Sequence, residues 1–267
     1  MTDITQDAPA PGVCRLTLNR PDALNSFTYA MYEELLGRLE AVRFDPQVQV
    51  VILTGTGRGF CAGHDVRGAG AAAWVPEGQG KVQTSRAILA KLGAIPLLMR
   101  ALPQPVICAV NGVTAGAGYS IALAADLCLA ARSAKFVNAF HNAGTGHELG
   151  LSYMLPRLVG AQRAAEILLT GRAVTAEEAA AIGMILAVVD DDKLADEALG
   201  LADRIAVNSP VGIALTKQSM WLNANAGSLD AAIELENRAI ILSQSTEDSA
   251  EKRAAFMEKR RPQFFSR

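Results

Sequence analysis

Two glycine-rich stretches decide the fold: Val50–Asp65 reads VVILTGTGRGFCAGHD, and Pro105–Asp126 reads PVICAVNGVTAGAGYSIALAAD. The apolar runs Val48–Thr54 and Pro105–Val110 are typical of strands that are buried on both faces. A glycine-rich turn follows each strand, and the second turn opens an apolar helix that runs through Ala125. The recurrence of strand, turn and helix predicts an α/β body.

The two turns, Gly59–Asp65 and Asn111–Gly118, have a composition that suits the binding of an anion. A glycine-rich turn between a strand and a helix leaves unpaired N–H groups that point one way, and the helix dipole adds partial positive charge. Gly63-His64 and Gly116-Ala117 are the natural donors, because small residues let a carbonyl oxygen approach the backbone closely. Ordinary tight turns have the same composition, so this pattern alone leaves both interpretations open.

The flanking segments continue the alternation of strands and helices. Val13–Leu18 alternates as a strand does. Thr28 is a candidate N-cap for a helix whose apolar stripe extends to Val42. Val82–Leu102 reads as a further helix, which Pro96 should kink or split.

The second half of the chain is mainly helical. Thr175 and Ser209 are predicted N-caps, and from about residue 195 the pattern is almost entirely helical. An α/β body that carries a helical appendage follows from this order. We therefore divide the chain into a core of residues 1–194 and a C-terminal helical region of residues 195–267.

Composition excludes several classes of protein. The chain has 267 residues and a formal net charge of −2, so it lacks the positive field that would attract nucleic acid or anionic lipid. Its longest apolar stretch, Val106–Ala131, is interrupted by Asn111 and Asp126 and does not resemble a membrane span. Four scattered cysteines without a CxxC pair and an acidic N-terminus predict a reduced, cytoplasmic protein.

Three other kinds of site compete for these residues. The segment GTGRGF, residues 55–60, is one glycine short of a dinucleotide fingerprint, and no amphipathic helix follows it at once. Residues 118–122, GYSIA, approach the GxSxG nucleophile elbow, which would make Ser120 a hydrolase nucleophile, but Ala122 breaks that pattern. The three histidines lack a zinc-binding spacing, so no metal is expected.

Six segments spread over nearly the whole chain carry a family resemblance through their order and spacing. They are LNRPDALNSF (18–27), VVILTGTGRGFCAGHD (50–65), PVICAVNGVTAGAGYSIALAAD (105–126), SYMLPRLVG (152–160), LTGRAVTAEEAAAIGMI (169–185) and STEDSAEKRAAFMEKRRPQF (245–264). Together they resemble the crotonase, or enoyl-CoA hydratase/isomerase, superfamily. The resemblance implies a spiral of ββα units, a C-terminal helical trimerisation region and an acyl-CoA substrate with no separate cofactor. It also implies a homotrimer or a dimer of trimers.

The resemblance further implies which residues contact the thioester. Family members stabilise a thioester enolate with two backbone N–H groups, which match His64 and Ala117 here; alanine at the second position keeps the N–H group. Lys259 matches a basic position that approaches the CoA phosphate from a neighbouring subunit, although it would equally complement the end of a helix. The positions implied to bind the substrate are Leu24, Ala62, Asp65, Val66, Gly116, Phe140 and Lys259.

The carboxylates distinguish the reactions of the family. Hydration across a double bond needs one carboxylate as acid and one as base, and the two glutamate positions of hydratases match Ser120 and Phe140 here. Glu148 instead matches an acidic position that dienoyl-CoA isomerases and 4-chlorobenzoyl-CoA dehalogenases use. Dehalogenation also needs a histidine base, whose position is Gly93. A single carboxylate suffices to move a double bond, so we expect an isomerase or lyase of this family, with isomerisation by Glu148 preferred.

Several alternatives stay open at this stage. Glu148 precedes a predicted helix, where an acid would also complement the helix dipole without any catalytic role. The missing carboxylate pair is compatible with a protein that only binds acyl-CoA, or with a hydratase that uses atypical residues. Trp74 and Tyr153 are candidates for the lining of an acyl pocket, but aromatic residues also belong to ordinary cores.

Overall fold

Two sheets form the centre of the molecule, which a computed structural model describes over residues 2–265. The larger has the order β1-β2-β3-β5-β7-β10 and the smaller has the order β4-β6-β8-β9. Neighbouring strands are parallel except for the pairs β1–β2 and β8–β9. The larger sheet contains β1 Ile4–Ala10, β2 Val13–Leu18, β3 Val50–Gly55, β5 Val106–Val110, β7 Leu127–Ala131 and β10 Ala187–Val189, and the smaller contains β4 Gly59–Cys61, β6 Val113–Ala115, β8 Lys135–Val137 and β9 Ala173–Thr175.

The chain winds as a spiral of ββα units. The units β3-β4-α2, β5-β6-α3 and β7-β8-α4 follow one another in sequence. Each unit gives its first strand to the larger sheet and its second strand to the smaller sheet. This arrangement confirms the predicted α/β spiral, and it stacks equivalent parts of successive units side by side.

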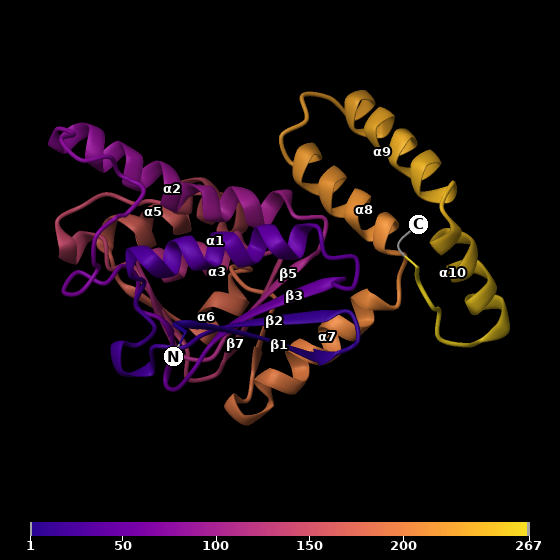
Figure 1. Ribbon diagram of the computed structural model, residues 1–267, viewed down its shortest axis with the longest axis horizontal. Coiled ribbons are helices and arrows are strands. Elements are labelled where there is room, and N and C mark those ends of the chain that lie inside the picture. Colours follow the sequence, from indigo (N-terminus) through magenta and orange to yellow (C-terminus); the bar gives the residue numbers. More distant parts are fainter. Residues whose placement is uncertain (1, 266–267) are drawn as a thin grey trace.

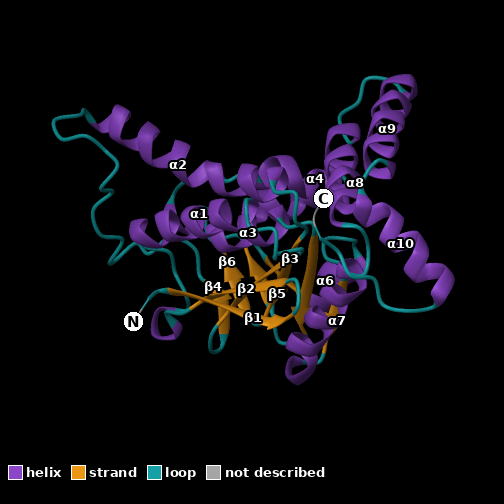
Figure 2. Ribbon diagram, turned by 45° about the vertical axis from the view of Figure 1, so that its right-hand side comes forward, coloured by secondary structure: helices purple, strands orange, loops and turns teal. Residues whose placement is uncertain are grey.

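Helices cover both faces of the larger sheet (Figures 1 and 2). Helices α1 and α2 pack together on one side, and α7 packs against β2, β3, β5 and β7 on the other. The helices are α1 Tyr29–Arg43, α2 Lys81–Ala101, α3 Ala117–Ala124, α4 Leu151–Val159, α5 Ala161–Thr170, α6 Ala176–Ala181, α7 Leu194–Ala206, α8 Pro210–Asn223, α9 Leu229–Gln244 and α10 Glu247–Glu258, with short 3-10 turns at Pro21–Ala23, His141–Ala143 and Asp191–Lys193.

The predicted start of the helical region, residue 195, falls within α7, and α7 still packs on the sheet. The helices that project away from the sheets are α8, α9 and α10 (Figure 1). Lys217 on α8 fastens them to the body: its buried ammonium group lies 2.7 Å from a carboxylate oxygen of Asp126 and donates to the carbonyl oxygens of Met99 and Gln104. Trp221, one turn further on, also donates to Asp126 at 2.7 Å.

Most predicted elements are confirmed, including the N-caps Thr28, Thr175 and Ser209, whose side chains accept backbone N–H groups. Strand β1 has no counterpart in the sequence prediction, because it is a polar edge strand without an apolar face. Strands β4 and β6 lie inside the stretches predicted as turns; each has three residues and is defined by pairing with its neighbour. Helix α2 remains one element through Pro96.

The pairing of β4 with β6 brings two backbones into unusually close contact. A Cβ atom at Gly118 would lie 2.4 Å from the carbonyl oxygen of Cys61, and a Cβ atom at Gly112 would lie 2.2 Å from the carbonyl oxygen of Arg58. No side chain fits at such distances from a backbone atom, so glycine is required at both positions.

We expect Gly118→Ala to lower the free energy of unfolding by roughly 3 kcal/mol or more, because the new methyl group forces the two backbones apart. Gly37→Ala is the matched control: Gly37 lies within α1 and a Cβ atom there meets nothing within 4 Å. That substitution should stabilise the protein by about 0.5–1 kcal/mol. Urea unfolding of both variants checks this prediction, and equal stability of the two variants contradicts it.

Candidate active site

The two glycine turns meet at Gly63 and Ala117. A Cβ atom built on Gly63 would lie 3.3 Å from the amide nitrogen of Ala117, and one built on Gly116 would lie 3.8 Å from the Cα atom of Gly63. Gly63 has a φ of 98° and Gly116 has a φ of 51°. Only glycine adopts these conformations readily, so glycine suits both positions of this close approach.

His64 and Ala117 supply the backbone N–H groups at this junction. His64 forms an isolated β-bridge with Phe27. In this bridge the Phe27 amide donates to the Gly63 carbonyl oxygen, and the Asp65 amide donates to the Phe27 carbonyl oxygen. This bridge does not use the His64 amide. Ala117 is the first residue of α3, so its own amide has no acceptor within the helix. Neither amide donates a hydrogen bond to any of residues 2–265. The junction therefore presents two free donors to an oxyanion.

The residues implied to follow the CoA chain lie beside the first turn. The Ala62 amide donates to the carbonyl oxygen of Leu24 at 2.9 Å, which ties the two segments together. Hydrogen bonds from the amides of Gly68 and Arg67 and the Arg20 guanidinium hold the pKa of Asp65 below its usual value. The Asp65 side chain is thus already paired, and it shapes the turn.

Val66 and Lys259 have different surroundings from the rest of the implied set. Val66 is 81% exposed and belongs to the outer surface of the turn. Lys259 follows α10 as its C-cap with a left-handed φ of 55°, and α10 packs on α8 and α9, away from the turns (Figure 1). Within one chain, Lys259 therefore does not lie with the two donors.

Glu148 is fastened to the first turn of α3. The buried hydroxyl of Ser120 donates to the carbonyl oxygen of Glu148 at 3.0 Å. Ser120 is three residues beyond Ala117, so the Glu148 backbone lies about one helical turn from the Ala117 amide. Partial burial raises the pKa of the Glu148 carboxyl group above its usual 4.5.

A second set of contacts supports the segment that precedes Glu148. Asn138 donates to the Leu168 carbonyl oxygen at 2.9 Å, and its amide group lies 3.1 Å from Nε2 of His147. The ring of Phe140, 7% exposed, meets the ring of His147 edge-on at 5.5 Å between centroids. Burial and the neighbouring His141 lower the pKa of His147. His147 therefore packs against Phe140 and contacts Asn138, which in turn bonds Leu168 of α5.

Aromatic side chains surround His64. Its ring centroid lies 5.0 Å from that of Tyr29 and 6.0 Å from that of Tyr32, and Tyr29 meets Trp74 edge-on at 5.6 Å. Of the two aromatic residues proposed from the sequence, Trp74 belongs to this cluster, whereas Tyr153 donates to Asn225 at 2.9 Å on a different part of the surface. The sequence prediction omitted the two tyrosines, although their spacing of three residues along a predicted helix places them on one face.

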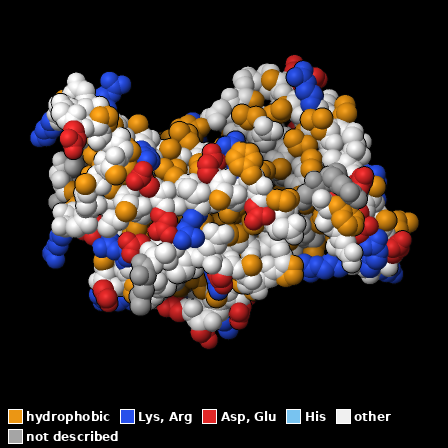
Figure 3. Space-filling view, viewed as in Figure 1, with side chains coloured by type: hydrophobic (Ala, Val, Ile, Leu, Met, Phe, Trp, Pro, Cys, Tyr) orange, Lys and Arg blue, Asp and Glu red, His pale blue; other side chains and the backbone are white. Residues whose placement is uncertain are grey.

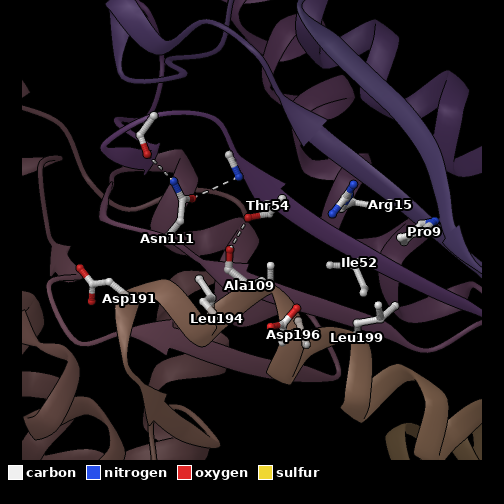
Figure 4. Close-up of a pocket in the computed structure, with 14 residues that line it drawn as sticks. Pro9, Arg15, Ile52, Thr54, Ala109, Asn111, Asp191, Leu194, Asp196 and Leu199 are labelled. Atoms are coloured by element: carbon white, nitrogen blue, oxygen red, sulfur yellow. Dashed lines mark hydrogen bonds between the residues drawn. The ribbon is translucent and has the colours of Figure 1, made fainter.

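A separate cavity of about 330 Å³ lies between α7 and the larger sheet (Figure 4). Two of its polar side chains are already paired: Thr54 donates to the Ala109 carbonyl oxygen, and Asn111 bonds the Gly55 amide and the Gly57 carbonyl oxygen. None of the implied catalytic or substrate-binding residues lines it. This cavity is therefore separate from the residues that the resemblance implies.

Neither a metal centre nor a membrane span stands out in the part of the chain that the structure describes. Residues 2–265 contain no group of three or more His, Cys, Asp or Glu side chains that is placed to hold a metal ion. Within the same residues, no helix has both the length and the apolar character needed to cross a bilayer.

The geometry does not support the hydrolase alternative. Ser120 is fully buried, its hydroxyl donates to main-chain carbonyl oxygens, and among the described residues no histidine hydrogen-bonds it. A nucleophile needs an adjacent base and access to substrate.

We therefore expect a fluorophosphonate probe to leave Ser120 unlabelled. Ser120→Ala should lower the free energy of unfolding by about 1 kcal/mol, because one buried hydrogen bond is lost. Labelling of the wild-type protein that disappears in Ser120→Ala, followed by mass spectrometry, would reinstate the nucleophile.

Comparison with known proteins agrees with this geometry. The family model for enoyl-CoA hydratase/isomerase matches residues 9–267. A probable enoyl-CoA hydratase of Mycobacterium bovis is 42% identical over 260 residues, which cover 96% of this chain and 90% of the relative. The 1,2-epoxyphenylacetyl-CoA isomerase of Escherichia coli is 42% identical over 255 residues, which cover 95% of each protein. The crystal structure of a probable enoyl-CoA hydratase/isomerase from Mycobacterium abscessus matches with a TM-score of 0.90 and 34% identity, and the match covers 100% of both chains. The chain belongs to the enoyl-CoA hydratase/isomerase family of the crotonase superfamily.

Proposed function

We propose that this protein isomerises the double bond of an enoyl-CoA thioester, with Glu148 as the proton carrier. The observation that supports this most directly is the hydrogen bond from the Ser120 hydroxyl to the main-chain carbonyl oxygen of Glu148, which holds the backbone of this residue about one helical turn from the free Ala117 amide. Phe140 stands at the second hydratase glutamate position and cannot transfer a proton. Relatives are named both as hydratases and as isomerases, so the choice between them rests on these residues.

The reaction needs one base and one anion-binding site. In a 3-enoyl-CoA, the Glu148 carboxylate removes a proton from C2, and the electron pair of that C–H bond moves into the thioester to form a dienolate. The amides of His64 and Ala117 stabilise the oxyanion, each by about 3 kcal/mol. Glu148 then returns the proton at C4, which leaves the double bond between C2 and C3 and regenerates the carboxylate. Coenzyme A takes part only as a portion of the substrate.

The other implied residues take supporting roles in this proposal. Leu24, Ala62 and the turn at Asp65 and Val66 flank the path of the CoA chain, and Gly116 lets the thioester approach the Ala117 amide. Phe140 excludes water from the carboxylate. A dry setting favours proton transfer to carbon and disfavours hydration.

The C-terminal helices carry a surface that suits association between subunits. Helices α8–α10 leave apolar side chains exposed, and Figure 3 shows such side chains gathered over these helices. Exposed apolar patches of this kind mark association surfaces. We propose a homotrimer or a dimer of trimers, in which Lys259 of one subunit approaches the CoA phosphate in another. The exposed apolar residues of these helices are Met220, Leu222, Leu229, Ile233, Ile240, Ile241, Leu242, Phe256 and Met257.

Glu148→Gln should reduce the isomerisation rate by roughly 10²- to 10⁴-fold, because an amide cannot accept the C2 proton. Binding of a saturated acyl-CoA should be retained. Glu40→Gln is a matched control, since Glu40 is exposed on α1 and pairs with Arg43. Turnover of a 3-enoyl-CoA, followed through the absorbance of the conjugated product, is the measurement; full activity of Glu148→Gln would refute the assignment.

The pH profile of kcat/KM should have an acid limb that belongs to Glu148. Burial raises the pKa of this group above 4.5, and the protonated form cannot act as a base, so activity falls as the pH decreases through the raised pKa. The midpoint of the limb is therefore expected above 4.5. A profile that stays flat down to 4.5 would show that another group removes the proton.

Two other activities are distinguishable in the same assays. A hydratase would convert a 2-enoyl-CoA to a hydroxyacyl-CoA, which requires water and two proton-transfer groups. A protein that only binds acyl-CoA would bind the esters without exchanging the C2 proton with deuterated water. Product analysis by mass spectrometry across enoyl, dienoyl and aroyl esters separates all three.

A further inference from the structure

The backbone around Glu148 is held on both sides and is strained between the two contacts. The Ser120 hydroxyl donates to the main-chain carbonyl oxygen of Glu148. His147, directly before Glu148, contacts Asn138, which follows β8. Leu149, directly after it, is buried and has a φ of 54°, a left-handed conformation that leucine rarely adopts. Such a conformation persists only where the surrounding structure holds it, so the contact of His147 helps to fix where Glu148 lies.

The side-chain amide of Asn138 has one favourable orientation. Its nitrogen lies 2.9 Å from the carbonyl oxygen of Leu168, which only accepts hydrogen bonds, and 3.1 Å from Nε2 of His147. The two hydrogens of the amide group therefore go to these two acceptors. Nε2 of His147 then carries no proton, so the ring is neutral with its proton on Nδ1.

A proton on Nε2 of His147 would disrupt this arrangement, because it would point at the hydrogens of the Asn138 amide. Rotation of the amide would offer Oδ1 to the ring, but it would also place Oδ1 against the carbonyl oxygen of Leu168, where two acceptors repel each other. Asn138 is 1% exposed, so solvent does not readily replace either bond. The contact between Asn138 and His147 therefore requires a neutral ring.

The neighbouring His141 also opposes a charge on His147. The two rings meet edge-on at 5.4 Å between centroids, and Nε2 of His141 donates to the same Leu168 carbonyl oxygen at 2.6 Å. Burial, and then His141, lower the pKa of His147 below its usual 6.5. Among residues 2–265, His141 is the titratable side chain that acts on His147 from the neighbouring elements. Gly171 lies against the His141 ring, and the charged side chains near Gly171 in the chain pair with one another: Glu166, Arg172 and Glu178.

We propose that neutral His147 is a positioning residue for Glu148: by accepting the hydrogen bond from Asn138 it holds the strained segment in place, and its protonation releases Glu148 from that place. This inference rests on the proposed function and adds a pH-dependent control of the same site. His147 acts through Glu148 and exchanges no proton with the substrate. Activity then falls at low pH for two reasons, because both the Glu148 carboxylate and the His147 ring become protonated. The logarithm of kcat/KM should therefore fall with a slope that approaches two.

Two variants of His147 separate its hydrogen bond from its titration. His147→Gln keeps an acceptor for Asn138 but does not titrate, so the slope should fall to one while kcat at neutral pH stays near that of the wild type. His147→Leu has no acceptor, and it should lower kcat roughly 10- to 100-fold because the base is misplaced. Its affinity for a saturated acyl-CoA should be retained, which separates this effect from a loss of folded protein.

His141→Gln is the matched control. It removes the neighbouring imidazole but leaves the contact between Asn138 and His147, so the slope should stay near two. Because His141 lowers the pKa of His147, the midpoint of the His147 titration should move to higher pH in this variant.

Nitrogen NMR of the isotope-labelled protein observes the ring without any turnover. His147 should have its proton on Nδ1 at neutral pH, and the amide resonances of Glu148 and Leu149 should shift as His147 titrates. The inference is overturned if Nε2 carries the proton at neutral pH, if His147→Leu keeps full kcat, or if His147→Gln keeps a slope of two. Absence of turnover on every enoyl-CoA ester would instead overturn the proposed function, and the NMR titration would still decide whether His147 holds the segment.

Discussion

Contact between the backbones of two glycine turns is the constraint on which the rest of the structure depends. Strands β4 and β6 pair in parallel, and Gly118 leaves no room for a side chain against the Cys61 carbonyl oxygen. The same contact sets Gly63 against Ala117, so the free amides of His64 and Ala117 belong to one junction. Fixed dipoles of this kind need no reorganisation when negative charge develops on a bound thioester, which is why a rigid junction suits enolate chemistry.

The proposed mechanism assigns oxyanion binding and proton transfer to different parts of the chain. The donors belong to the ββα spiral itself, whereas the carboxylate belongs to the segment that leads into α4. One hydrogen bond, from Ser120 to Glu148, joins the two. The sequence resemblance places Ser120 where hydratases have a glutamate, and in the structure its small hydroxyl holds the backbone of Glu148, the acid of the proposed mechanism.

Much of the fold followed from the sequence. Apolar strands and N-caps such as Thr28 have local signals, because a cap depends on residues within one turn of it. The three-residue strands β4 and β6 have no such signal; only their partner strands define them. The link between Ser120 and Glu148 joins residues 28 apart, and the cluster of Tyr32 with His64 depends on how α1 crosses the first turn. Contacts of this kind come from packing and are not encoded in local spacing.

The central claim is that the amides of His64 and Ala117 hold the thioester oxygen while Glu148 faces C2. A crystal structure of the protein with a saturated acyl-CoA tests it most directly. The account predicts a thioester oxygen within roughly 2.7–3.1 Å of both amide nitrogens and the Glu148 carboxylate beside C2. A thioester oxygen bound by only one of these amides, or a Glu148 carboxylate turned away from C2, would contradict it.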